Sequence, residues 1–229
     1  MKNFLLIVSA LLIGAHSYTQ HNQWTVKAGE NIKEVLGDSV IFQYPQFMPG
    51  SVYFKDKTVS IARFNLNLVN GEMQFIDLSE DTMTLDNEST IQYVIIQTDT
   101  FYYDKVYVNL IHGNAIAKLA KVVAIVPGDI QKVGGYGQAS SASSINSSSY
   151  FYNGNQIVKL NEDKIITLHK RTIYFIGDNF NHFLPVNKEN IHSMFTKQKP
   201  AIDNFIKENK IVLDKEADLL KLIDFLEKE

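Results

Sequence analysis

The residues best suited to proton-transfer chemistry in this sequence are Asp178 and His182, in the segment GDNFNHF. A carboxylate beside an imidazole can orient the ring and stabilise its protonated form, as a general acid–base pair requires. Loops next to rigid strands commonly carry functional side chains. Asp, Asn and His also close turns through ordinary hydrogen bonds, and we favour this structural interpretation. We therefore assign no catalytic residue and keep Asp178 and His182 as candidates only.

Other sequence motifs that are typical of metal-binding or catalytic sites are missing. The histidines form no His-x-His or His-x-x-x-His pair, so we expect no metal site and no cofactor. No Gly-x-Ser-x-Gly nucleophile elbow occurs. The chain has 0 cysteines, which excludes disulfides, thiolate zinc sites and thiol catalysis.

An aromatic cluster at Phe101, Tyr102 and Tyr103 suggests a binding surface instead. Tyrosine and phenylalanine offer large contact areas, and tyrosine adds a hydroxyl that can meet a partner's polar groups. Because successive side chains of a strand point to opposite faces, at least one of Phe101 and Tyr102 is expected to be exposed. Packing in the core is the alternative for these rings. We predict Phe101, Tyr102 and Tyr103 as binding residues for a protein or glycan partner.

The elements that must position these residues are mainly short β-strands. The clearest is the hairpin around Asn70-Gly71, a pair of residues that tolerates the positive φ angles of a tight two-residue turn. This turn would place Leu68 opposite Met73 and Leu66 opposite Phe75. One face of the hairpin would then be apolar and the other mostly polar.

A second turn at Asp56-Lys57 would place Val52 opposite Ile61. Farther along the same strand the apolar residues change from odd to even positions, as at Phe64 and Leu66. Since side chains alternate with a period of two, this change predicts a β-bulge or a strand buried on both faces. We favour a bulge near Ile61-Ala62.

Short runs rich in β-branched and aromatic residues continue from Ser39 to Ile176, with a first strand expected at Ser39–Tyr44. An outer-membrane barrel would show similar strands, but the end of the chain is helical. After Pro185 the apolar period changes to that of helices, which bury Ile191, Phe205 and the stripe Leu219, Leu222, Ile223 and Leu226. We predict a mainly β protein of antiparallel meander sheets, sandwich- or barrel-like, with a C-terminal cap of about three short α-helices.

The N-terminus resembles a secretory signal peptide, with Lys2 preceding the apolar run Phe4–Gly14. Small residues favour cleavage after Ser17 or Thr19. A transmembrane anchor is the alternative, but the run is shorter than the roughly 20 residues that cross a bilayer. We predict a signal peptide at 1–19, an antiparallel β domain at 20–185 with a mobile Gly/Ser-rich loop at 134–149, and a helical segment at 186–229 packed on the β domain.

Composition limits the partners. The net charge of −3 does not provide the excess of basic residues that nucleic-acid binding requires. A hydrophobic content of 45% with 21% charged residues is ordinary for a globular protein. The apolar run Ala115–Val126 contains Lys118 and Lys121 and is too short to span a bilayer, so we expect no transmembrane segment in the mature chain.

Several phrases of the sequence are similar to an uncharacterised family of exported Bacteroidetes proteins. They are VYFKD, NGEMQFID, DTFYYDK, GGYGQ, IYFIGD and FIKENKI, followed by a final helix with Asp-Leu-Leu. The resemblance covers most of the mature chain and implies an exported protein, in the periplasm or at the cell surface. It implies no activity, ligand or catalytic residue.

These observations favour a non-enzymatic exported envelope protein that acts as a binding or structural module. The alternative is a hydrolase of envelope polymers with a site near Asp178 and His182. A concave pocket with converging polar groups around His182 would favour the hydrolase. The sequence does not indicate an oligomeric state.

Overall fold

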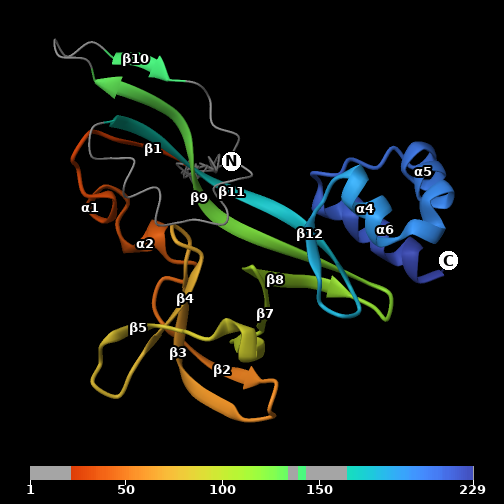
Figure 1. Ribbon diagram of the computed structural model, residues 1–229, viewed down its shortest axis with the longest axis horizontal. Coiled ribbons are helices and arrows are strands. Elements are labelled where there is room, and N and C mark those ends of the chain that lie inside the picture. The colour runs from red at the N-terminus through yellow and green to blue at the C-terminus, as the bar shows by residue number, and fades with distance from the viewer. Residues whose placement is uncertain (1–21, 134–138, 143–163, 229) are drawn as a thin grey trace, which may run out of the picture.

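The computed structural model of the protein describes residues 22–133, 139–142 and 164–228 (Figure 1). The expected signal peptide at 1–19 lies outside these residues, as does most of the expected loop at 134–149. Within that loop, Ala139–Ala142 form strand β10, which pairs with the end of β9 (Ala117–Val133).

The described residues form one antiparallel sheet of 12 strands, in the order β1-β11-β9-β8-β7-β6-β2-β3-β4-β5, with β10 beside β9 and β12 beside β11. Nearly every strand pairs with its neighbour in sequence, as short turns between antiparallel strands dictate. The remaining strands are β1 (Gln23–Val26), β2 (Met48–Phe54), β3 (Val59–Asn67), β4 (Glu72–Ile76), β5 (Thr82–Thr84), β6 (Ile91–Ile96), β7 (Asp99–Asp104), β8 (Val106–Gly113), β11 (Lys164–Asp178) and β12 (Phe183–Pro185). The expected mainly β fold with C-terminal helices is confirmed.

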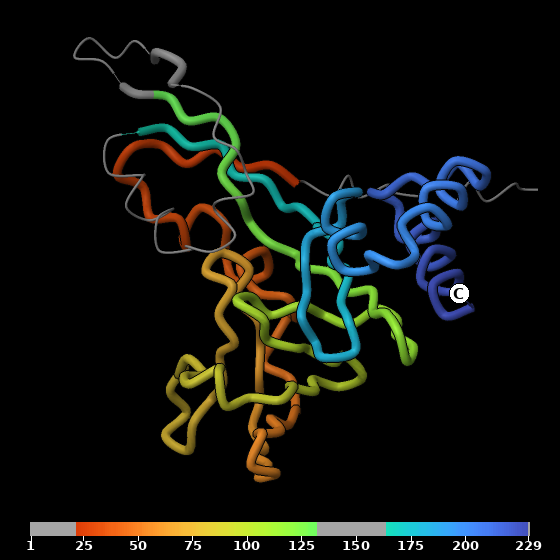
Figure 2. Tube along the Cα trace, turned by 45° about the vertical axis from the view of Figure 1, so that its right-hand side comes forward, coloured from red at the N-terminus to blue at the C-terminus, as the bar shows by residue number. Residues whose placement is uncertain are grey.

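The helices gather mostly at the C-terminal end, where Figures 1 and 2 show them at one side of the molecule, away from β2–β5. They are α4 (Lys188–Met194), α5 (Lys199–Glu208) and α6 (Glu216–Lys228), with a 3-10 turn at Thr196–Gln198. The Asn187 side chain caps α4 by accepting the backbone N–H of Asn190. None of the described helices is long and apolar enough to cross a membrane.

The prediction that helices begin only after Pro185 is wrong. Two short helices, α1 (Ile32–Leu36) and α2 (Asp38–Ile41), lie between β1 and β2, and α2 occupies the start of the expected strand Ser39–Tyr44. The Asn31 side chain caps α1 by accepting the N–H of Lys33 at 2.9 Å. Ile32, Leu36 and Ile41 then all turn into the core. A 3-10 turn at Glu88–Thr90 also interrupts the strands.

The β3–β4 hairpin exists, but its register differs from the prediction. Leu66, not Leu68, lies opposite Met73, and residues 68–71 form the turn. The cause is Asn67, whose Oδ1 accepts the backbone N–H groups of Val69 and Asn70 and so turns the chain early. Gly71 supplies the positive φ of 72°. The apolar face is the predicted one, because the shift is by an even number of residues.

The expected bulge near Ile61-Ala62 is absent. The β2–β3 register runs without a shift from Met48 opposite Phe64 to Tyr53 opposite Val59, and Ser51 lies opposite Ile61. Phe64 and Leu66 face the core, while Ile61 and Val59 on the other face are 81% and 50% exposed. The change of parity therefore reflects apolar residues that stay on the outer face.

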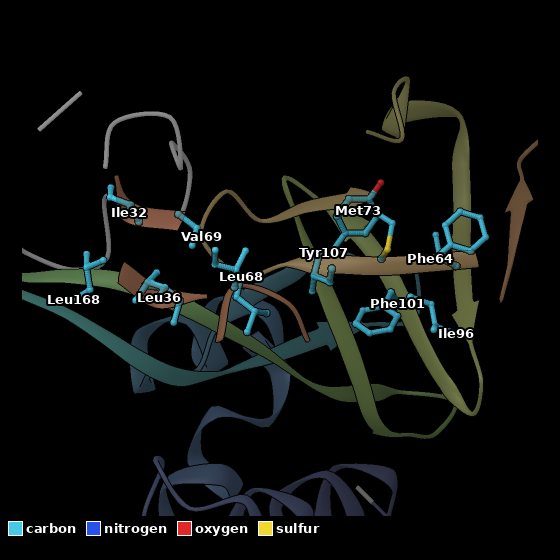
Figure 3. Packing of buried hydrophobic residues seen from close by; sticks show 14 of the residues in the cluster. Ile32, Leu36, Phe64, Leu68, Val69, Met73, Ile96, Phe101, Tyr107 and Leu168 are labelled. Atoms are coloured by element: carbon cyan, nitrogen blue, oxygen red, sulfur yellow. The ribbon is translucent and has the colours of Figure 1, made fainter. Parts of the chain in front are cut away.

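The long strands β9 and β11 connect the two ends of the molecule (Figure 1). The sheet curls where β9 passes the β3–β4 turn. There the backbone N–H of Ile125 on β9 donates to the C=O of Leu68 in that turn at 2.8 Å. The main core fills this curl, and Figure 3 shows Phe64, Met73 and Phe101 within it. At the other end, the α6 stripe packs with Ala117, Leu119 and Ile176 of the strands. The C-terminal helices thus pack against one end of β9 and β11 through α6.

Candidate functional site

Asp178 and His182 lie at the hairpin between β11 and β12. Asp178 Oδ1 accepts the backbone N–H groups of Phe180 at 2.8 Å and His182 at 2.9 Å. Its other oxygen, Oδ2, lies 3.1 Å from His182 Nδ1. The backbone N–H of Asp178 also donates to the C=O of His182. The predicted pair is therefore formed, and the same carboxylate closes the turn.

The electrostatics of this turn stabilise an ionised carboxylate. Burial raises the pKa of Asp178, but hydrogen bonds from His182 and Phe180 and the charge of His182 outweigh it and leave the pKa below its usual value. The His182 side chain is 72% exposed. Among the described residues, no hydroxyl or amine side chain is hydrogen-bonded to the His182 ring. The part of the chain that the structure describes therefore places no protein nucleophile beside this imidazole.

The predicted aromatic residues take different positions. Phe101 is 1% exposed and belongs to the core, so its assignment to a binding surface is wrong. Tyr103 is half-buried and contacts Tyr107 with ring centroids 4.9 Å apart. Tyr102 lies on the outer face of the sheet, where it contacts Tyr93 and Phe183 at 6.1 and 5.8 Å. Alternation along the strand accounts for the difference between Phe101 and Tyr102.

Tyr102 belongs to a row of rings that crosses the sheet. Tyr53 on β2 and Tyr93 on β6 are register partners, and their rings stack with centroids 4.6 Å apart at an angle of 28°. Val59 and Ile61 continue the same face on β3. We name Tyr53, Val59, Ile61, Tyr93 and Tyr102 together the tyrosine face. Sequence analysis missed most of it because strand pairing, not proximity along the chain, brings these residues together.

The tyrosine face ends at a hollow of about 230 Å³. Tyr102 and Tyr103 line it from β7, while Phe180, Asn181 and His182 line it from the β11–β12 turn. The other lining residues are Lys55, Ile91, Gln92 and Asp104. The two candidate sites of the sequence thus meet in one place.

Hydrogen bonds fix the walls of this hollow. Asp104 Oδ2 accepts the backbone N–H of Phe183 at 2.7 Å and so ties β7 to the β11–β12 hairpin. Lys55 Nζ donates to the C=O of Ser89 at 2.7 Å. Asn181 Oδ1 is buried and accepts no hydrogen bond from the described residues, which is costly for an amide oxygen. The walls of the hollow are therefore held through Asp104 and Lys55.

The hydroxyl groups around the hollow are donors at neutral pH. Burial and, to a smaller extent, the proximity of Tyr93 raise the pKa of Tyr102. Burial and, to a smaller extent, the charges of Glu88 and Asp104 raise the pKa of Tyr103. Among the described residues, no three His, Asp or Glu side chains come together as metal ligands would. This arrangement can hold a partner through apolar contact and hydrogen bonds.

No family model, curated protein or solved structure matches the chain.

Proposed function

We propose that this chain is an exported, non-enzymatic binding protein of the cell envelope that holds a partner protein on the tyrosine face. An apolar side chain of the partner enters the hollow between Tyr102 and His182. The observation that carries the proposal is the convergence of Tyr102, Tyr103, Phe180 and His182 on one hollow beside exposed aliphatic residues. Aromatic anchors at the centre with polar groups at the rim are typical of protein interfaces.

The geometry of the rings favours a protein over a glycan at this surface. Tyr53 and Tyr93 stack on each other, so each covers a ring face that a sugar would need. Ile61 and Val59 offer aliphatic surface next to them. Exposed apolar patches of this kind commonly mark protein contacts. The partner should therefore present apolar side chains to Ile61 and hydrogen-bond acceptors to the tyrosine hydroxyls.

The alternative, a hydrolase using Asp178 and His182, has the 3.1 Å contact between these residues in its favour. Against it, Asp178 Oδ1 is already occupied by the turn, and the imidazole is mostly in water. General-base catalysis also needs a substrate or nucleophile within hydrogen-bond reach of the ring. Asp178→Asn separates the two functions: it removes the carboxylate of the proposed hydrolase pair and abolishes hydrolysis. It keeps an oxygen for the N–H groups of the turn, and Asp178 does not line the hollow, so partner binding stays in place.

Export is part of the proposal because the N-terminal sequence has the charge and apolar run of a signal peptide. The similarity to exported Bacteroidetes proteins supports the same location, in the periplasm or on the cell surface. Fractionation of the native host should recover a mature chain outside the cytoplasm that begins at Tyr18 or Gln20. A full-length cytoplasmic form starting at Met1 would contradict export.

Photocrosslinking in the native host tests the surface. A photoreactive benzoylphenylalanine replaces Ile61 in one strain and Phe180 in a second; a third strain carries it in place of Leu78, an exposed apolar residue of the β4–β5 turn that serves as the control. We expect the first two positions to give an adduct with the same second protein, and Leu78 to give none. Tyr102→Ala should lower the adduct yield several-fold. Equal labelling from Leu78, or adducts only between copies of this chain, would refute a distinct protein partner here.

A further inference from the structure

We propose that a second cavity, between the α1–α2 segment and the β3–β4 hairpin, binds a neutral polyhydroxylated ligand such as a sugar unit of an envelope glycan. The cavity has a volume of about 630 Å³. Small-molecule sites in proteins commonly measure roughly 300–1,000 Å³. Its lining residues are Gly29, Glu30, Asn31, Ile32, Lys33, Asp38, Ile41, Phe42, Phe47, Asn67, Val69, Asn70, Gln74 and Thr82.

The apolar part of the lining can cover the C–H face of a sugar ring. Ile32 of α1 and Val69 of the β3–β4 turn are two buried apolar residues of this lining. Phe42 and Phe47 meet edge to face, with centroids 5.4 Å apart at an angle of 60°. Unlike the stacked Tyr53 and Tyr93, two rings in this geometry leave most of their faces uncovered by each other. An aromatic face is the surface on which a sugar ring packs.

The polar part of the lining is made of amides with free hydrogen-bonding capacity. Asn67 Oδ1 is used by the turn, while its Nδ2 has no partner among the described residues. Asn70 Nδ2 donates to Glu72, which leaves its Oδ1 free within the described chain. The Gln74 side chain makes no hydrogen bond to any described residue, and it projects from β4 into the cavity. Each amide offers both a donor and an acceptor, which is the pattern that hydroxyl groups satisfy.

The charges of the lining argue against an ionic ligand. Lys33 Nζ lies 3.8 Å from Asp38 Oδ1, so this lysine already has an acidic neighbour. Glu30 Oε2 accepts the backbone N–H of Lys27. Among the described residues no arginine lines the cavity, although the planar guanidinium group is the usual ligand of carboxylates and phosphates. The charged side chains of the lining already have neighbours of their own, so a neutral ligand does not have to compete for them.

The segment that carries the two phenylalanines is held rigidly. Between Phe42 and Phe47, the backbone of Tyr44 and Gln46 is hydrogen-bonded to the side chain of Asn65 on β3. Phe42 itself forms a β-bridge with Asn67. A wall that is fixed before binding reduces the ordering cost of the complex. The cavity is thus built by the fold and is separate from the tyrosine face, so either proposal can fail alone.

The test is a titration of the mature chain, labelled with ¹⁵N, with two neutral trisaccharides, cellotriose and triacetylchitotriose, at millimolar concentrations. Deacetylated chitotriose, a cation, and trigalacturonate, an anion, serve as charged probes. We expect at least one neutral trisaccharide to shift the side-chain amide signals of Gln74 and Asn67, with weaker or no shifts from the charged probes. Gln74→Ala should weaken this binding at least tenfold and leave the melting temperature unchanged, because the side chain makes no hydrogen bond to the described part of the chain.

The matched control is Gln92→Ala, which removes a glutamine from the hollow at the tyrosine face and should leave trisaccharide binding unchanged. Phe47→Ala provides a second variant and should weaken binding by loss of the aromatic wall. The proposal is overturned if neither neutral trisaccharide shifts Gln74, if a charged probe binds more tightly, or if Gln74→Ala binds as the wild type does.

Discussion

The side chain of Asn65 binds the backbone of Tyr44 at two points. Its Oδ1 accepts the N–H of Tyr44 at 3.0 Å, and its Nδ2 donates to the C=O of Tyr44 at 2.9 Å. The same amide also reaches the C=O of Gln46 and the N–H of Leu66. Asn65 is 1% exposed, so these bonds replace water that cannot reach the site. One buried amide therefore fastens an irregular segment to strand β3.

Removing this amide should cost much of the stability of the protein. Asn65→Ala leaves buried backbone groups of Tyr44 and Leu66 without partners, and we expect a loss of about 2–4 kcal/mol in the free energy of unfolding. Urea denaturation measures it. The control, Asn179→Ala, changes an exposed asparagine of the β11–β12 turn and should stay within about 0.5 kcal/mol of the wild type. A similar small loss for Asn65→Ala would mean that the segment 42–47 is held by its apolar contacts instead.

Two tyrosine hydroxyls should respond in opposite ways to the same substitution. Tyr107 OH is buried and has no hydrogen-bond partner among the residues that the structure describes, so Tyr107→Phe should leave stability unchanged or raise it by up to about 1 kcal/mol. Tyr44 OH donates to Asp99 Oδ2 at 2.5 Å, so Tyr44→Phe should lower stability by about 1–3 kcal/mol, a bond to a charged group being the stronger kind. Thermal and urea unfolding of both variants compare them directly. Destabilisation of Tyr107→Phe as large as that of Tyr44→Phe would show that Tyr107 has a partner after all.

The parts of this fold that depend on local pattern could be predicted from the sequence. Phe64 and Leu66 were expected on the buried face and lie there, and the apolar stripe of α6 packs on the sheet. Register was harder, because the extra hydrogen bonds of Asn67 that move the turn cannot be recognised from Asn70-Gly71 alone. The helices α1 and α2 are too short to establish a 3.6-residue period.

The candidate site was less predictable because it is non-local. Tyr102 and His182 were each chosen for their own chemistry, and only the order of the strands brings them to one hollow. A bulge near Ile61-Ala62 was expected to account for the change of parity, but β3 pairs with β2 without a shift and Ile61 is exposed. Its exposure depends on the pairing of β2 with β3 and β6, which a single sequence does not reveal.

The C-terminal helices should be necessary for the stability of the sheet. Leu222 is 0% exposed and lies where α6 meets the strands, so Leu222→Ala should cost about 2–5 kcal/mol. Val212→Ala, at a residue that is 40% exposed, serves as the control and should cost under about 1 kcal/mol. Truncation after Pro185 should uncover Leu119 and Ile176, lower the melting temperature sharply and increase binding of an apolar dye. If the truncated chain melts as the full chain does and stays monomeric, the helices are an independent module.

The Asp178 carboxylate should make stability depend on pH in the acid range. Its pKa in the folded chain is lowered, because hydrogen bonds from His182 and Phe180 together with the charge of His182 outweigh the opposing effect of burial. A group with a lowered folded-state pKa binds protons more readily when unfolded, where its pKa is about 4. Its contribution is therefore complete above that value and disappears as the pH falls through the folded-state pKa. Asp178→Asn keeps an oxygen for the backbone N–H groups of the turn but removes the charge.

The measurement for this last prediction is urea unfolding of the wild type and Asp178→Asn at a series of pH values from neutral to strongly acidic. We expect the wild type to be the more stable at pH 5 and above, and the difference to vanish at the acid end. The same series in a His182→Gln background removes the charged partner of Asp178. In that background, the difference in unfolding free energy between the chain with Asp178 and the chain with Asp178→Asn should be smaller at pH 5. A difference between the wild type and Asp178→Asn that is constant across the series would show that the carboxylate acts in this turn only as a neutral acceptor.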